Sequence, residues 1–463
     1  MDEKKVLALY DFASKQNFIY RTSKIREISG ASAMLADAFK KFPAMLDTDA
    51  GCSVVMKYDF SDEFTLEKFE NSNADAEVLY DGGGSLMVLY KSQEKYIEAN
   101  RAISKNLLVN YPTLSLIVCC VEYTGDFKAD RSNLYAESAR RKNCYPASDF
   151  FAVTPVTQVD PMTFMPVVKK VTKPYEQSLS ADRAAKQKYF TPSENDKLEA
   201  LEGMTAVIYI DGNAMGQRLK NCESEYYEDG VAKLRSFSKS VQELFVTAPL
   251  DAISKAVGDT GYRQVIGGGD EITIICQAEQ AWELVCRYFE ILGSRELEIT
   301  DAKGEVVEKS ECNSCAGIAV FHSKMPFNVA YEIAEAACES AKEKSRGDNG
   351  NYVDFYFCHA GITNDFKSLR KAEQAHATAR PYKLEDARAI FGKIAPVLRN
   401  AERSNVKALG RAAQESFEKY MLEVKRVNAY LPKGSEKFSG TKDEMNVVYD
   451  MAEFYDIWFA KEG

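Results

Sequence analysis

Apolar positions recur along the chain with the two periods typical of strands and helices. Near the N-terminus, VLALYDF has the composition of a buried strand, and residues 23–42 place apolar side chains at helical spacing. Residues 77–90, EVLYDGGGSLMVLY, predict a strand, a glycine turn and a second strand. A helical pattern from Ser92 to about Asn110 and an apolar run at 114–123 predict one more helix and one more strand.

The same series of elements starts again at Met204, about 190 residues later. TAVIYIDGNAMG predicts a strand and turn, and Glu223 to about Val257 is mostly helical in pattern. RQVIGGGDEITIICQ predicts a second glycine hairpin, residues 280–292 a helix and residues 315–322 a strand. A repeat of this length indicates a duplicated domain. Each copy predicts an α+β, ferredoxin-like βαββαβ sheet with helices on one face, and the two copies can face each other.

These patterns divide the chain into four parts. We expect a first module at 1–146, a linker at 147–203 with five prolines and one short helix near 179–188, and a second module at 204–361. Only helical patterns follow, which predicts a C-terminal helical domain at 362–463.

Composition limits the function classes. The chain has 463 residues, is 45% hydrophobic and 28% charged, and carries a formal charge of −10, which argues against a protein that binds bare nucleic acid through its own charge. It shows neither a signal peptide nor a membrane-length apolar run, so we expect a cytoplasmic protein without a membrane. The eleven cysteines are scattered, many in apolar runs, and the single CxxC, Cys312 and Cys315, has no second pair. Three histidines argue against histidine-based hydrolysis.

The second glycine hairpin contains more glycine than a turn requires. Gly267, Gly268 and Gly269 stand in succession, whereas a hairpin needs one or two residues with positive φ. Glycines without a Cβ allow a ligand to approach the backbone closely. Asp270 and Glu271 follow directly and suggest what that ligand carries.

A third carboxylate precedes this hairpin in the sequence. Asp211 ends the strand AVIYI, and in a ferredoxin-like sheet that first strand lies beside the hairpin, so we expect Asp211, Asp270 and Glu271 to converge. Like charges this close repel unless cations neutralise them. Oxygen ligands in an open turn favour Mg²⁺ or Mn²⁺, and two such ions support nucleotidyl transfer. Taken alone, GGDE also fits an exposed β-turn and Asp211 fits a turn or helix-capping residue.

Three motifs of this second module resemble a known family. IYIDGNAMG at 208–216, GGGDEI at 267–272 and the stretch 316–346 resemble the catalytic palm domain of the large polymerase/cyclase subunit of type III CRISPR effector complexes. That palm is itself similar to GGDEF diguanylate cyclases. Residues 17–32, the DGGGS turn and ARPYKLEDA resemble the first palm and a later region of the same subunit.

The resemblance implies nucleotides bound between two palms, with the second palm converting ATP into 3′,5′-linked, usually cyclic, oligoadenylate second messengers. It implies two Mg²⁺ or Mn²⁺ ions on Asp211, Asp270 and Glu271. Lys342 matches a lysine that meets the triphosphate, although a lysine in the last turn of a helix also complements the helix dipole. The further nucleotide-binding candidates in this palm are Gly212, Asn213, Gly268 and Gly269.

The first module departs from this pattern. Asp11 stands in the place of Asp211, but the hairpin reads GGGS, with Ser85 where an acid is needed. One carboxylate cannot hold two divalent ions, so we interpret the first palm as non-catalytic. Gly82, Gly83 and Gly84 then leave room for the phosphates or base of an acceptor nucleotide, with a purely structural hairpin as the alternative. Gly83, Gly84 and Ser85 are the nucleotide-binding candidates of this palm.

Other departures from the family leave alternatives open. We expect the histidine-aspartate nuclease domain to be missing, because the chain has no His-Asp pair. We also expect the inter-palm four-cysteine zinc site to be missing, because only Cys144 lies near that region. Asn213 stands where many relatives have a second aspartate, and Ile272 replaces the phenylalanine of GGDEF enzymes. The alternatives to an ATP cyclase are a catalytically silent scaffold and a diguanylate cyclase-like enzyme. Expected partners are nucleoside triphosphates and, in a complex, guide RNA and other effector-complex subunits; the oligomeric state stays open.

Overall fold

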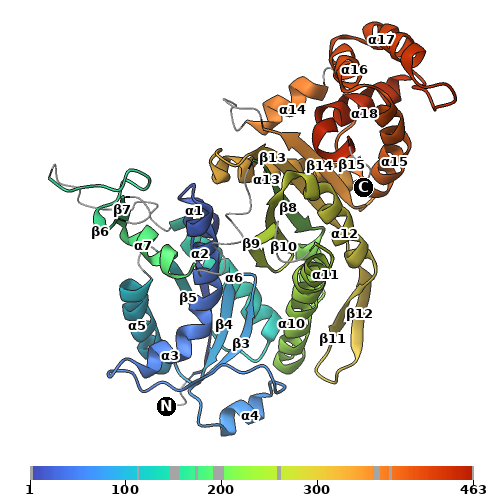
Figure 1. Ribbon diagram of the computed structural model, residues 1–463. Helices are drawn as coiled ribbons and strands as arrows, with labels where there is room; N and C mark the ends of the chain where they lie inside the picture. The colour runs from blue at the N-terminus through green and yellow to red at the C-terminus, as the bar shows by residue number, and fades with distance from the viewer. Residues whose placement is uncertain are drawn as a thin grey trace.

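The computed structural model has two sheet-containing modules and a helical end, which Figure 1 shows from blue to red along the chain. It describes residues 4–111, 114–144, 156–172, 176–190, 203–257, 262–358, 365–374 and 378–460. Three stretches of the predicted linker, 147–155, 173–175 and 191–202, lie outside the described residues, as do His359 and His376. Mixed helix and strand in this arrangement confirm the α+β class with two ferredoxin-like modules and a C-terminal helical region.

The first module folds around one five-stranded sheet. Its strands are β1 (Val6–Phe12), β2 (Met56–Lys57), β3 (Ala76–Gly82), β4 (Ser85–Tyr90) and β5 (Leu116–Glu122). Their order is β2-β3-β4-β1-β5, with β1 antiparallel to both of its neighbours, which is the order that a βαββαβ unit produces. Its helices are α1 (Lys15–Tyr20), α2 (Ile25–Ala38), α3 (Phe42–Asp47), α4 (Leu66–Asn71), α5 (Gln93–Asn110) and α6 (Phe127–Cys144).

The second module repeats this order and extends it. Its sheet runs β15 (Tyr382–Lys383), β14 (Tyr352–Phe357), β13 (Ser314–His322), β8 (Met204–Gly212), β10 (Glu271–Gln277) and β9 (Tyr262–Gly268). The last four form the ferredoxin-like unit, and β14 is added parallel to β13. Its helices are α9 (Met215–Lys220), α10 (Tyr227–Gln242), α11 (Ala248–Val257), α12 (Ala281–Gly293) and α13 (Phe327–Ser345), and β11 (Glu296–Thr300) and β12 (Val306–Glu311) form a separate hairpin.

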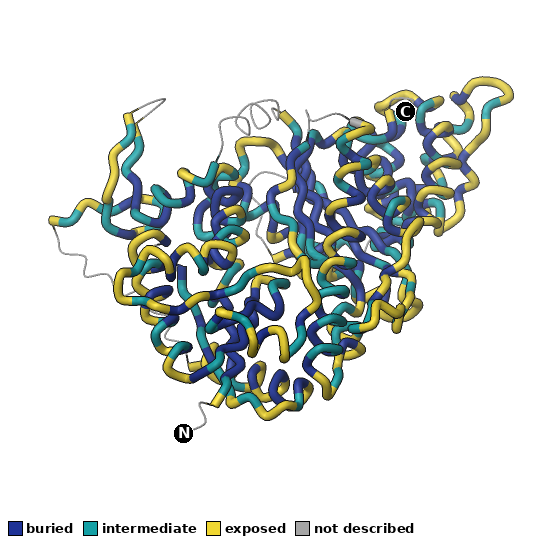
Figure 2. Tube along the Cα trace, turned by 90° about the horizontal axis from the view of Figure 1, so that it is seen from below, coloured by how far each residue is buried: buried dark blue, intermediate teal, exposed yellow. Residues whose placement is uncertain are grey.

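Helices cover both faces of the second sheet, so the prediction of helices on one face is wrong here. Along β8, Ile208 and Ile210 pack in one core with residues of α10 and α12, whereas Val207 and Tyr209 pack in another core with residues of α13. The reason is the added crossover: α13 connects β13 to a parallel strand, and such a connection passes over a face of the sheet. Figure 2 shows the buried segments gathered along the sheets.

The two modules pack directly against each other. The first sheet is covered on one face by α2, α3 and α5, and residues of α6 on its other face share a core with α10 of the second module. In this core Phe127 meets Tyr227 edge to face, with ring centroids 5.0 Å apart. The Tyr227 hydroxyl donates to Asp130 Oδ2 at 2.5 Å. The expectation that the two modules face each other is therefore confirmed.

The described part of the linker braces the first module. β6 (Val167–Val171), β7 (Gln177–Ser180) and α7 (Ala181–Lys188) form a small unit, in which α7 confirms the helix predicted near 179–188. α7 packs on α2, and buried Arg183 binds both Glu27 and Asp160 at 2.9 Å. Charges buried this deeply are tolerated because each is paired.

The C-terminal region is helical but returns once to the sheet. Its helices are α14 (Phe366–Gln374), α15 (Leu384–Asn400), α16 (Arg403–Glu415), α17 (Phe417–Tyr430) and α18 (Lys442–Glu453). β15 follows α14 and pairs with β14, so the sheet continues beyond residue 361, and a domain boundary there stays a prediction. Buried Arg380 pairs with Asp450 of α18 at 3.0 Å and ties the helices to this edge. None of the described helices is long and apolar enough to cross a membrane.

Candidate active site

The glycine hairpins of the two modules are built alike. In the first, Gly82 pairs with Ser85; in the second, Gly268 pairs with Glu271, so each turn contains two residues. Gly269 has a φ of +66°, a backbone conformation that residues other than glycine rarely adopt. A Cβ added to Gly268 or Gly269 would meet no atom within 4 Å, so open space lies over this turn.

Strand register then fixes which residue faces which. Asp211 of β8 is directly opposite Glu271 of β10, as predicted from the strand order. In the first module Asp11 of β1 is directly opposite Ser85 of β4. The two positions are equivalent, so the first palm has a hydroxyl in the place of the second palm's glutamate.

Asp270 packs onto the end of the same strand. The Gly212 N–H donates to the Asp270 carbonyl oxygen at 3.1 Å. A Cβ at Gly212 would stand 2.8 Å from the Cβ of Asp270, closer than real contacts allow. Glycine at 212 therefore lets Asp270 lie against β8, next to Asp211.

Carboxylates outnumber cations in this cluster. Burial, and after it the Asp211 charge, raises the pKa of Asp270. Burial, Asp211 and Glu335 raise the pKa of Glu271 to about 7. Lys342 Nζ lies 2.6 Å from Asp211 Oδ2 and 3.1 Å from the Gly212 carbonyl oxygen. Three carboxylates facing one lysine leave an excess of two negative charges if all are ionised, which additional cations would neutralise.

These residues fit divalent cations by charge and donor type. All three acids offer the hard oxygen atoms that Mg²⁺ prefers, with substrate phosphates commonly completing the coordination. Within the described ranges, no three histidine, cysteine or carboxylate side chains are already arranged so that they could hold an ion. Lys342 forms an ion pair with Asp211 Oδ2, so this oxygen would have to separate from the lysine in order to bind a cation.

Asn213 is turned away from these acids. Its side-chain amide donates to Ser345 Oγ at 2.9 Å and to the Gly350 carbonyl oxygen at 3.3 Å, and it is buried. These contacts tie the turn after β8 to the end of α13, the helix that carries Lys342. The structure thus gives Asn213 partners within the protein, and its expected contact with a nucleotide stays a prediction.

The first palm balances its acid differently. Asp11, 5% exposed, forms ion pairs with two lysines: Lys15 Nζ at 2.6 Å from Oδ1, and Lys142 at Oδ2. Lys15 also donates to the Gly83 carbonyl oxygen at 3.1 Å. One carboxylate with two ammonium groups has an excess of one positive charge, so this palm needs no further cation.

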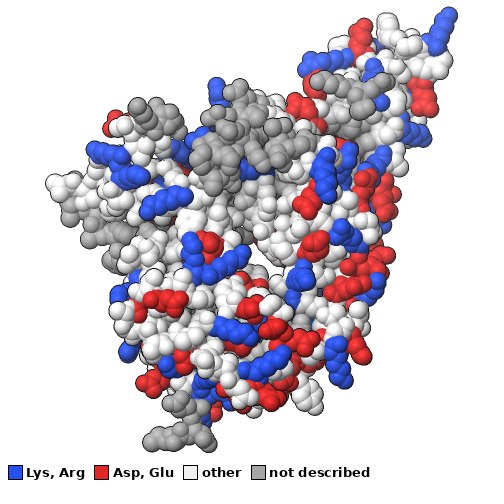
Figure 3. Space-filling view, turned by 60° about the horizontal axis from the view of Figure 1, so that its bottom comes forward, with Lys and Arg blue, Asp and Glu red and all other residues white. Residues whose placement is uncertain are grey.

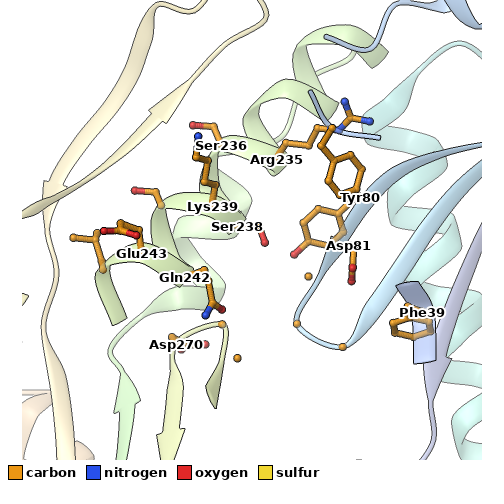
Figure 4. A pocket seen from close by; sticks show the side chains of 18 of the residues that line it. Phe39, Tyr80, Asp81, Arg235, Ser236, Ser238, Lys239, Gln242, Glu243 and Asp270 are labelled. Atoms are coloured by element: carbon orange, nitrogen blue, oxygen red, sulfur yellow. The ribbon is translucent and has the colours of Figure 1, made fainter. Parts of the chain in front are cut away.

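A cavity of about 1950 Å³ lies between the two hairpins and contacts both palms. Of the predicted site residues, Gly83, Gly84, Gly268, Gly269, Asp270 and Glu271 line it; Asp211, Gly212, Asn213, Lys342 and Ser85 do not. Asp211 lies behind this lining, opposite Glu271 in the sheet, and Lys342 pairs with Asp211. Figure 4 shows α10 with Lys239 and Gln242 on one wall, Asp270 below it, and Tyr80 and Asp81 across the cavity. Figure 3 shows a hollow between the two halves, with charges of both signs around it.

Three residues near the carboxylates of the two palms were not named from the sequence: Glu335, Gln16 and Lys15. Glu335 lies seven residues before Lys342 on the same face of α13, and Gln16 of the first palm donates to its Oε1 at 3.2 Å. Lys15 stands four residues after Asp11. Helical spacing from Lys342 is a signal for Glu335, whereas nothing in the sequence predicts which palm Gln16 contacts.

Comparison with known proteins identifies this arrangement. Residues 204–350 match the family model of the Cas10/Cmr2 second palm domain. The crystal structure of a Csm1–Csm4 cassette in complex with cA3 aligns with a TM-score of 0.56 at 14% sequence identity, over 97% of this chain and 70% of that chain. A Csm1–Csm4 cassette in complex with one ATP aligns with a TM-score of 0.55 at 14% identity, over 100% of this chain and 70% of that chain.

A third structure extends the likeness to an assembled system. The Csm1–Csm4 subcomplex of the type III-A CRISPR–Csm interference complex aligns with a TM-score of 0.52 at 13% identity, over 97% of this chain and 70% of that chain. A sequence search of curated proteins returns no match. At these identities the structural likeness shows a common fold. Residues 204–350 thus carry a Cas10/Cmr2-type second palm domain, and the chain as a whole has a Cas10-like fold with two palms.

Proposed function

We propose that this chain is a metal-dependent nucleotidyltransferase, whose second palm joins ATP molecules into 3′,5′-linked cyclic oligoadenylates for CRISPR-type antiviral signalling. The observation that carries the proposal is the charge asymmetry across the cavity. Three carboxyl groups, Asp211, Asp270 and Glu271, lie near one lysine in the second palm, while the first hairpin has Ser85 in the place of Glu271. One palm is suited to catalysis and the other to holding a second nucleotide.

The reaction is a displacement at phosphorus. The 3′-hydroxyl oxygen of an ATP held against the first palm attacks the α-phosphorus of an ATP held against the second palm. A new P–O bond forms, the bond to the β-phosphate breaks, pyrophosphate leaves with the electron pair, and the hydroxyl proton passes to solvent. Attack by the terminal 3′-hydroxyl of the linear product on its own 5′ α-phosphorus closes the ring; the bond to its β-phosphate breaks, a further pyrophosphate leaves, and the hydroxyl proton passes to solvent.

Asp211, Asp270 and Glu271 would hold the divalent cations. Such ions activate the attacking hydroxyl and stabilise negative charge on the phosphates and on the leaving pyrophosphate. Gly268 and Gly269 leave the backbone beside them open, so a triphosphate can approach the hairpin closely. Lys342, the partner of Asp211, would meet a phosphate of the bound nucleotide as a compact positive charge.

The size of the cavity supports two substrates. Pockets for one small ligand have volumes of about 300–1,000 Å³, and the inter-palm cavity of about 1950 Å³ exceeds that range. The two glycine hairpins at its walls let one nucleotide lie against each palm.

The choice of adenine rests on the family. The aligned Csm1–Csm4 cassettes were solved in complex with one ATP and with cA3. Their fold is common to this chain, so the same substrate and the same class of product are the first to test here. Partners such as effector subunits and guide RNA belong to the proposal on the same ground.

The test is a product analysis. Purified protein is incubated with ATP, GTP, CTP or UTP and Mg²⁺ or Mn²⁺, with and without target RNA and co-purifying partners, and products are identified by mass spectrometry. We expect cyclic oligoadenylates from ATP, lost in Asp270→Asn and retained in Asp49→Asn, a surface acid paired with Lys105. A cyclic dinucleotide from GTP would indicate a diguanylate cyclase instead. No product under any condition would contradict enzymatic function and favour a scaffold.

A further inference from the structure

The first palm carries an ammonium group where the second palm needs metal ions. Lys15 lines the cavity, with Nζ 2.6 Å from Asp11 Oδ1 and 3.1 Å from the Gly83 carbonyl oxygen. A Cβ added to Gly84 would stand 2.6 Å from the same Nζ, so the lysine lies directly against the glycine turn. In the second palm the corresponding position lies between Asp211 and the hairpin that carries Asp270 and Glu271.

The charges of the two positions are opposite. Asp11 is neutralised by Lys142 at its other carboxylate oxygen, so Lys15 leaves this position with a net charge of +1. The second palm has a net charge of −2 at its equivalent position, if its three acids are ionised and Lys342 is charged. A nucleotide's phosphates carry several negative charges, so the first position attracts them directly, whereas the second repels them until cations bind.

From this geometry we infer that the first palm contains a metal-independent nucleoside triphosphate subsite in which Lys15 binds the phosphates. The inference rests on the proposed function, because it concerns the second nucleotide of the same cavity. Each palm then holds one triphosphate by a different means, the second through divalent ions and the first through a lysine.

Three features make Lys15 able to bind a phosphate. Lys142 stays on Asp11 when Lys15 turns to the ligand, so no buried carboxylate is left unpaired. An ammonium group forms short, charge-assisted hydrogen bonds with phosphate oxygens. Nothing within 4 Å would meet a Cβ at Gly83, so the phosphates have space above the turn.

Charged groups beside this turn include Asp81 and Lys40. Asp81, beside the turn, also lines the cavity and would repel phosphates when ionised. Its carboxylate accepts a hydrogen bond from the Tyr58 hydroxyl, and burial raises its pKa. Lys40 lines the cavity too and offsets its charge.

Calorimetric titration with a non-hydrolysable ATP analogue, adenylyl imidodiphosphate, tests the inference on the full chain. In EDTA we expect one bound analogue per chain, and in excess Mg²⁺ two. Lys15→Gln should weaken the metal-free binding at least about tenfold, which corresponds to about 1.4 kcal/mol. Asp270→Asn should abolish only the Mg²⁺-dependent binding event.

Control variants separate phosphate binding from folding. Lys105→Gln removes a lysine that pairs with Asp49 on the surface and should change neither binding event. Lys142→Gln leaves Lys15 as the remaining partner of Asp11 and should weaken the metal-free event less than Lys15→Gln does. Circular dichroism and thermal melting of each variant verify the fold.

Two results would overturn the inference. One is the absence of any analogue binding in EDTA by the wild-type protein, with both events appearing only with Mg²⁺. The other is metal-free binding that Lys15→Gln leaves unchanged. Either result leaves cyclase activity open, and a lack of cyclic product would leave a metal-free site intact, so the two proposals fail separately.

Discussion

At the residue scale, one cross-strand pair distinguishes the two palms. Asp211 faces Glu271, whereas Asp11 faces Ser85 in the same register. Burial, and after it the charge of Asp211, raises the pKa of Glu271, because both disfavour its ionised form. The first palm avoids this repulsion with one acid and two lysines. Acids kept close together at a cost in stability indicate a functional site.

Asp270→Asn tests whether this carboxylate serves catalysis and not folding. We expect cyclic product to fall at least about a hundredfold, equivalent to about 2.7 kcal/mol of transition-state stabilisation. Because the pKa of Asp270 is raised in the folded protein, its charge destabilises the fold at neutral pH when no cation is bound. The melting temperature of the variant in EDTA should therefore equal or exceed that of the wild type. A lower melting temperature would mean that Asp270 mainly stabilises the fold.

Gly212→Ala tests the close approach of Asp270 to β8. The new Cβ would stand 2.8 Å from Asp270 Cβ, so it should displace Asp270 and lower the reaction rate at least about tenfold. Gly216→Ala is the matched control, because its Cβ would meet nothing within 4 Å. Steady-state rates of both variants check the prediction. Equal rates would show that the position of Asp270 does not depend on Gly212.

The sequence could predict the acids of the second palm better than the lysines of the first. Asp211 and Glu271 lie together because both belong to adjacent strands, and strand order follows from the βαββαβ pattern. The pairing of Lys142 with Asp11 depends on how α6 packs against β1, which no local pattern encodes. Contacts between palms, such as that of Gln16 with Glu335, were not predictable for the same reason.

At the element scale, the short helix α1 connects the two palms. Lys15 at its start contacts the first hairpin, Gln16 contacts Glu335 on α13, and Tyr20 at its end stacks on Tyr331 with ring centroids 3.8 Å apart. The major elements followed from apolar periodicity, and α5, α12 and β13 lie within two residues of their predicted ranges. β14 and the β11–β12 hairpin were not expected, because the duplicated pattern contains no counterpart for them.

The linker unit gives a prediction on pH at this scale. Burial favours a higher pKa for Asp160, but backbone N–H groups of Met162 and Ser180 and the Arg183 guanidinium outweigh it and lower that pKa. A lowered pKa contributes stability that is complete above the unfolded value, about 3.9, and is lost as the pH falls through the folded value. Asp160→Asn should cost about 2 kcal/mol or more at pH 7.

Urea unfolding between pH 7 and pH 3 measures this contribution. The difference in free energy of unfolding between wild type and Asp160→Asn should be constant at neutral pH and shrink below about pH 4. A difference that persists at pH 3 would mean that the variant disturbs packing and that the charge of Asp160 contributes nothing.

At the scale of the whole molecule, the proposed function requires both palms to stay in contact. Arg235 of α10 donates to the carbonyl oxygens of Leu79 at 2.8 Å, Val78 at 3.0 Å and Asp62 at 3.3 Å. Its guanidinium also lies over the Phe60 ring, 4.5 Å from the centroid. One side chain of the second palm thus binds the strand β3 that leads into the first hairpin.

Arg235→Ala should loosen this contact without touching the carboxylates. Hydrogen exchange of the β3 amides should accelerate at least about tenfold, because three hydrogen bonds to that region are lost. Arg295→Ala is the control: Arg295 also lines the cavity but pairs with Glu243 of its own palm. Equal exchange in the two variants would mean that other contacts hold the palms together.

The central claim is that the three acids of the second palm bind divalent cations and that the first palm does not. A crystal structure with Mn²⁺ and a non-hydrolysable ATP analogue, with anomalous diffraction to locate manganese, tests it most directly. The account predicts Mn²⁺ at Asp211, Asp270 and Glu271 and no Mn²⁺ at Asp11. Manganese bound at Asp11, or an analogue bound at the second hairpin without any metal, would contradict it.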